Sequence, residues 1–190
     1  MKRLPAILLF ALPRTAATTR YEIKPVYSTV RFSIVKWGVL KEEGVFRNFN
    51  GTLDYDAERP ERSRVDLVVD AASLDTKNDG RDSTVKSEDF LDVRRHPTME
   101  FHSTAVKGNV VTGNLTLHGV TRRIQFQVKP LGIRNVPRVG KLAGFETTFT
   151  INRQQFGVTG GRWTAAGGPG VLSDAVEIHI IIGATEPRTR

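Results

Sequence analysis

Short segments in which apolar and polar residues alternate are the feature that most limits what this chain can fold into. Successive side chains of a strand point to opposite faces, so a period of two predicts antiparallel strands with one buried face. Eight segments show this pattern, at residues 30–34, 49–55, 65–69, 99–102, 114–118, 123–128, 145–152 and 176–182. The sequence therefore predicts an all-β fold, either a closed barrel or a two-sheet sandwich.

One segment, residues 83–93, predicts a short helix instead. It ends before His96, which the following Pro97 forces into an extended conformation. Glu88 and Asp92 are four residues apart on this predicted helix. A solvated helix face explains these two acids better than a pair of catalytic carboxylates, because like charges at this spacing repel each other.

The apolar faces of the predicted strands suggest a ligand cavity. Eight strands closed into a barrel leave an interior that is either packed with side chains or able to hold one small ligand. These faces are rich in phenylalanine and leucine: Phe32, Phe49, Leu53, Phe101, Leu115, Leu117, Phe126, Phe145 and Phe149. The glycine-rich residues 157–170 lack the Lys-Ser/Thr pair of a phosphate-binding loop, so they predict a connection or a lid in which Trp163 caps an opening.

The start of the chain differs from the rest. In residues 1–17, two basic residues precede an apolar stretch at 4–12, and small residues follow at 15–17. The apolar stretch is too short to span a bilayer, and the pattern is typical of a secretory signal peptide. We therefore expect a signal peptide over residues 1–17, one domain over residues 18–190, and a periplasmic or secreted location.

The charge of the chain does not indicate nucleic-acid binding. The net charge is +8, and residues 1–17 hold three basic residues and no acid, which leaves +5 for the rest. The remaining basic residues are scattered, as on a solvated surface, although weak attraction to an anionic membrane surface stays open. The chain has no cysteine, which excludes disulfides, thiolate metal sites and a cysteine nucleophile.

The four histidines do not form a recognisable catalytic or metal motif. His96, His102, His118 and His179 lack metal-ligand spacing, and no nucleophile motif accompanies them. If His96 and His102 share one extended run, they lie roughly 20 Å apart and cannot bind the same metal ion. His118-Gly119 lies where two predicted strands meet, which favours a tight turn over a catalytic base. We expect no catalytic residue, no metal and no cofactor.

Several ordered motifs resemble the YceI-like family. They are YEIKPVYSTVRFSI, GVFRNFNGTLDYD, SLDT followed by RDSTVKSEDFLDVRRHPTMEF, VTGNLTLHGVTRRIQF and TINRQQFGV, and the match runs from about Tyr21 to Ala184. The resemblance implies a secreted, lipocalin-like barrel of eight antiparallel strands. It also implies that the interior binds a polyisoprenoid, or another isoprenoid-tailed or fatty lipid, without catalysis.

For such a ligand the expected contacts are apolar, because an isoprenoid tail offers nothing to hydrogen-bond and binds mostly through burial. The predicted lining is Phe32, Phe49, Leu53, Phe90, Phe101, Leu115, Leu117, Phe126, Phe149 and Trp163. Arg81, Asp82, Asn152 and Arg153 match polar positions of the family motifs. We expect them to make fold-organising contacts rather than to touch the ligand, because buried polar groups must be paired.

The chain departs from the family motifs in two places. Lys24 and Tyr27-Ser28 stand where the family often has Asp and His-Ser, and residues 83–85 replace a frequent His-Leu after Asp82. Any head-group contact made by those family histidines is absent here.

Two other functions stay open from the sequence. One is a hydrolase or isomerase that acts on such a lipid through His118 or His102. The other is a solid-core barrel that serves as the partner of a membrane protein. The oligomeric state is not predicted.

Overall fold

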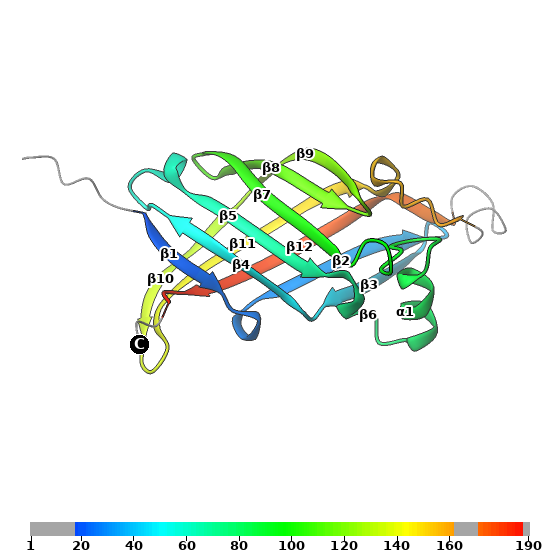
Figure 1. The fold of residues 1–190 in the computed structure, drawn as a ribbon, viewed down its shortest axis with the longest axis horizontal. Coiled ribbons are helices and arrows are strands. Elements are labelled where there is room, and N and C mark those ends of the chain that lie inside the picture. Colours follow the sequence, from blue (N-terminus) through cyan, green and yellow to red (C-terminus); the bar gives the residue numbers. More distant parts are fainter. Residues whose placement is uncertain (1–17, 162–170, 188–190) are drawn as a thin grey trace, which may run out of the picture.

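The structure is a computed structural model that describes residues 18–161 and 171–187. These ranges form an elongated barrel of antiparallel strands, with one α-helix, α1 (Asp79–Lys86), at the end opposite the β10–β11 hairpin (Figure 1). The strands are β1 (Thr19–Ile23), β2 (Thr29–Lys36), β3 (Leu40–Phe46), β4 (Phe49–Tyr55), β5 (Arg64–Asp70), β6 (Leu74–Asp75), β7 (Thr98–Lys107), β8 (Val110–Leu117), β9 (Val120–Gln127), β10 (Lys129–Val136), β11 (Gly140–Asn152) and β12 (Leu172–Thr185). Within the described ranges, no helix is long and apolar enough to cross a membrane.

The strands pair in the order β6-β3-β2-β12-β1-β4-β5-β7-β8-β9, and β11 pairs with both β12 and β10. One edge of β12 is covered by β11, while its other edge pairs first with β2 and then with β1. Between β9 and β11 a side-chain hydrogen bond takes the place of a backbone ladder: Thr147 Oγ1 donates to the carbonyl oxygen of Gln127 at 2.6 Å. The rings of Phe126 and Phe149 stack across the same junction.

The all-β antiparallel fold with one helix is confirmed, and each of the eight predicted segments overlaps a strand. Six segments lie wholly within their strands, and the other two run one residue past β8 and β9, to His118 and Val128. The structure divides the sheet into twelve strands rather than eight because four long strands are bent. Each of these long strands is interrupted by a short break and therefore counts as two strands: β1 and β2, β3 and β4, β5 and β6, and β9 and β10. Pro25, which has no N–H to donate, begins the 3-10 turn between β1 and β2.

The helix lies earlier than residues 83–93, so that prediction is wrong in its bounds. The Asn78 side chain accepts a hydrogen bond from the N–H of Arg81 at 2.9 Å and caps α1, which starts at Asp79. The helix ends before Ser87, whose extended backbone leads into a series of turns. Glu88 and Asp92 therefore do not share a helical face.

Two glycines allow phenylalanine rings to lie flat against the inner face of the sheet. A Cβ atom at Gly44 would come within 2.5 Å of the Phe32 ring, and one at Gly113 within 2.4 Å of the Phe101 ring. Real Cβ atoms do not approach other heavy atoms this closely, so the absence of a side chain at these positions sets how the two rings lie.

Candidate ligand cavity

Two neighbouring cavities lie along the interior of the described part of the barrel. The inner chamber has a volume of about 220 Å³ and is lined mainly by apolar residues of the barrel strands. The second, the α1 chamber, has a volume of about 500 Å³ and lies against α1 and the turns that follow it. Five residues line both chambers and so form the boundary between them: Phe46, Met99, Leu117, Ile151 and Ile178.

Eight of the ten predicted lining residues lie on these two chambers. The inner chamber is lined by Leu53, Phe101, Leu115, Leu117, Phe126 and Phe149. The α1 chamber is lined by Phe32 and Phe90, and also by Leu117. Phe49 is buried in the core and is not among the lining residues. Trp163 lies outside the described residues.

Other residues that line the chambers were not predicted from the sequence, although the alternating pattern of the strands marks some of them as inward-facing. Ile151 stands on the same apolar face as Phe149, two residues further along the strand. Ile178 stands on the apolar face of the predicted strand at 176–182, from which no lining residue was predicted. Phe46 lies in β3, where Lys41, Glu42 and Glu43 hide the alternation.

Three phenylalanine rings form a continuous aromatic wall in the inner chamber. Phe101 and Phe126 have ring centroids 5.3 Å apart at 50°, and Phe126 stacks on Phe149 at 4.5 Å and 11°. The rings come from β7, β9 and β11, so the wall spans the place where β9 and β11 lack a backbone ladder. The aromatic contacts therefore close the barrel with apolar surface at that junction.

Hydrogen bonds and an ion pair hold α1 against β3 and the segment that follows β6, beside the α1 chamber. The Arg81 guanidinium donates to Thr76 Oγ1 at 2.9 Å and to the Thr76 carbonyl oxygen at 2.8 Å, and it forms an ion pair with Glu42. Asp82 accepts a hydrogen bond from the N–H of Thr76 at 2.8 Å. Asn152 caps the turn after β11 by accepting from Gln154 N at 2.9 Å. These residues make the fold-organising contacts expected of them, and Arg81 also lines the chamber.

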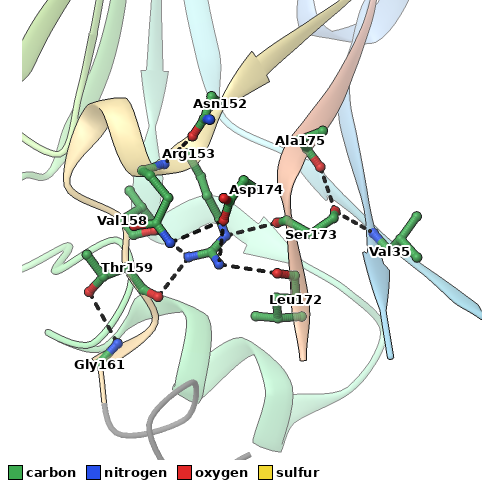
Figure 2. Close-up of polar contacts among 11 residues, drawn as sticks. Val35, Asn152, Arg153, Val158, Thr159, Gly161, Leu172, Ser173, Asp174 and Ala175 are labelled. Carbon is green, nitrogen blue, oxygen red and sulfur yellow. Dashed lines mark hydrogen bonds and ion pairs between the residues drawn. The ribbon is translucent and has the colours of Figure 1, made fainter. Parts of the chain in front are cut away.

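Arg153 makes the densest set of contacts in this region, which Figure 2 shows. Its side chain is only 5% exposed. The guanidinium donates to four backbone carbonyl oxygens at 2.7–3.3 Å, those of Val158, Thr159, Leu172 and Ser173. It also pairs with Asp174 at 3.3 Å. Burial lowers the pKa of the Arg153 guanidinium, and the Asp174 carboxylate opposes this effect.

His102 and His179 lie on the polar side of the sheet and pair with acids. His102 Nδ1 lies 2.7 Å from Asp66 Oδ1, and His179 Nε2 lies 3.2 Å from Glu146 Oε1. The hydrogen bond to Asp66 is the main cause that raises the pKa of His102, and Glu100 adds to it.

The raised pKa of His102 makes part of the stability depend on pH. Protonated His102 is favoured in the folded chain, so its contribution is complete below the unfolded pKa of about 6.5 and disappears as pH rises through the folded pKa. We expect His102→Gln to destabilise the protein at pH 5 but hardly at pH 9, by less than about 1 kcal/mol because the pair is exposed. Urea unfolding at both pH values measures the difference. A pH-independent difference would contradict this assignment.

His118 forms the predicted turn between β8 and β9. His118 and Gly119 have φ values of 52° and 72°, which is the left-handed pair that a two-residue hairpin requires. The structure also places His118 beside His96 and Asp92, a grouping that sequence spacing did not reveal because two separate segments supply it. None of the four histidines lies among the residues that line the two chambers.

Antiparallel strands wrapped around an apolar, two-chambered interior define a lipocalin-like barrel. The chain belongs to the YceI-like family, because the YceI-like domain matches residues 21–184.

Curated relatives and solved structures agree with this membership. A UPF0312 protein of Pseudomonas putida (strain W619) is 34% identical over 180 residues, which is 92% of this chain and 90% of the relative. BcnA of Burkholderia cenocepacia has the same fold, with a TM-score of 0.76 and 24% identity over 86% of this chain and 99% of its own. A polyisoprenoid binding domain from Saccharophagus degradans, implicated in plant cell wall breakdown, matches with a TM-score of 0.67 and 17% identity over 88% and 98%.

Proposed function

We propose that this protein binds a long apolar lipid, a polyisoprenoid or an isoprenoid-tailed molecule, inside the barrel without changing it chemically. The observation that carries the proposal is the pair of neighbouring chambers that share a boundary around Leu117. The likeness to the polyisoprenoid binding domain of S. degradans supports the same class of ligand.

The distribution of polar residues suggests how such a lipid would lie. The inner chamber is walled mainly by aliphatic and aromatic side chains, which suit a tail that gains affinity through burial. Charged residues stand in the lining of both chambers, but the α1 chamber has the larger polar share. Its charged lining residues include Lys36, Glu42, Arg81 and Arg153. The tail would therefore fill the inner chamber, and a polar head group would lie in the α1 chamber.

Two observations favour binding over the alternative functions. A histidine-dependent hydrolase or isomerase needs its base within reach of the substrate, but the histidines lie outside the chamber linings. A solid-core barrel would leave no interior space, whereas this barrel holds chambers of about 220 and 500 Å³.

Native mass spectrometry of the untagged protein from its own host tests the proposal. We expect a co-purifying apolar adduct, and we expect the delipidated protein to take up one molecule of a C45 prenyl alcohol. A protein that is isolated empty and takes up no prenyl alcohol would contradict lipid binding. The same spectrum gives the mass of the chain, and loss of residues 1–17 would support the periplasmic location that we include in the proposal.

A further inference from the structure

Three potential metal ligands meet on the outside of the cavity wall. Asp92, His96 and His118 each offer one ligand atom, and these three atoms all lie within 4.8 Å of one another. Asp92 follows Leu91 and His118 follows Leu117, and both leucines line the α1 chamber. The group therefore joins two segments of the wall that are separate in sequence.

Local backbone structure brings the three side chains together. The N–H of His96 donates to the carbonyl oxygen of Asp92 at 2.8 Å, which closes a single turn with the two residues four apart. His118 reaches the same place from the β8–β9 turn, and its ring lies 4.7 Å from the ring of His96. A Cβ atom at Gly119 would lie 2.6 Å from His96 Cε1, so this glycine makes room for the imidazole.

The surroundings of His118 match those of a metal-binding histidine. Its Nδ1 lies 3.2 Å from the carbonyl oxygen of Phe156, and a carbonyl can only accept a hydrogen bond. In the neutral imidazole, Nδ1 therefore carries the proton and Nε2 keeps its lone pair. Metal-binding histidines almost always have their second ring N–H held by a carboxylate or carbonyl in this way.

The environment of Asp92 gives a reason for a cation. Its side chain is only 11% exposed, and its ion-pair partner Arg95 is 78% exposed at a distance of 3.6 Å. An ion pair with so exposed a partner offsets little of the free-energy cost of burying the Asp92 carboxylate. The backbone of Asp92 is also left-handed, with φ of 41°, a conformation that is uncommon for residues other than glycine.

We propose that Asp92, His96 and His118 bind a divalent transition-metal ion of the zinc type. Two imidazole nitrogens and one carboxylate oxygen suit Zn²⁺, Ni²⁺ or Cu²⁺ rather than Mg²⁺ or Ca²⁺, which prefer all-oxygen sites. Bonds of about 2.0–2.1 Å in a tetrahedral site place ligand atoms roughly 3.3 Å apart, so the side chains draw together on binding. The bound ion cross-links the 92–96 turn to the β8–β9 hairpin and leaves one coordination position for water.

The test measures zinc binding to the untagged protein after treatment with a chelator. We expect calorimetry to show one Zn²⁺ per chain and added Zn²⁺ to raise the melting temperature, because an ion that binds only the folded state stabilises it. His96→Gln and His118→Asn should each weaken binding by at least about 100-fold and abolish the thermal shift, because removing a direct ligand costs no less than disturbing its hydrogen-bond partner. Asparagine tolerates the left-handed turn at position 118, so this variant should fold.

His102→Gln is the matched control, since His102 also contacts carboxylates but lies outside the cluster. It should bind Zn²⁺ as the wild type does. The proposal is overturned if the wild type binds no zinc at micromolar concentrations, or if both cluster variants bind it unchanged. The result does not depend on the bound lipid, because zinc is measured on delipidated protein.

Discussion

Replacing Leu117 with tryptophan is expected to lower the affinity for a C45 prenyl alcohol by about 1000-fold while the chain stays folded. Leu117 is 8% exposed and borders both chambers, so an indole at this position would occupy space along the boundary between them. If the indole excludes one five-carbon isoprene unit, the loss is about 4 kcal/mol at roughly 0.8 kcal/mol per carbon, which corresponds to about 1000-fold. Titration of the delipidated variant measures this loss.

Thr116→Trp is the control for this substitution. Thr116 is the neighbouring residue, lies on the opposite face of β8 and bonds through its hydroxyl to Thr121 Oγ1 at 2.8 Å. The bound lipid should be preserved in this variant. If the interior is a solid core, Leu117→Trp should instead destabilise the fold by about 1–3 kcal/mol, with no lipid in the wild type. That outcome would contradict the carrier function.

Arg153→Met is expected to destabilise the protein by about 3–5 kcal/mol, because it removes the donor from four buried or partly buried carbonyl oxygens at once. At about 2–4 °C per kcal/mol for a chain of this size, the melting temperature should fall by roughly 6–20 °C. Thermal melts and urea unfolding measure the effect.

Asp174→Asn separates the ion pair from these carbonyl contacts. Asp174 is 56% exposed, so its loss should cost less than about 1 kcal/mol. If Asp174→Asn destabilises as much as Arg153→Met, the ion pair rather than the carbonyl contacts holds this region together.

The positions of the main strands could be predicted because burial of one face leaves a clear trace in the sequence. Phe101, Leu115 and Phe126 stand on alternating segments, and they line the inner chamber. The alternation of apolar and polar residues is absent where a strand contains a run of charged residues or is bent. β3 carries Lys41-Glu42-Glu43, and β10 contains Pro130 and Gly132, so neither strand was predicted.

The helix and the histidine cluster show where sequence patterns carry too little information. Apolar residues after α1 belong to turns that pack on the core, and their spacing imitates a helix that continues past Ser87. The cap formed by Asn78 was the more reliable signal for the start of α1. Asp92 and His118 are 26 positions apart in the sequence, and only the pairing of β8 with β9 and the turns near α1 place them together.

The pairing of β12 with both β1 and β2 has a consequence for how the chain folds. One edge of β1 and of β2 pairs with β12, so it stays without these hydrogen bonds until the final strand is present. The paired residues are 136 to 163 positions apart in the sequence. Closing so long a loop costs entropy before any contact compensates for it, and folds dominated by distant pairings are slow to form. Refolding of this chain should therefore take milliseconds to seconds or longer, and the edges of β1 and β2 stay open to other strands during that time.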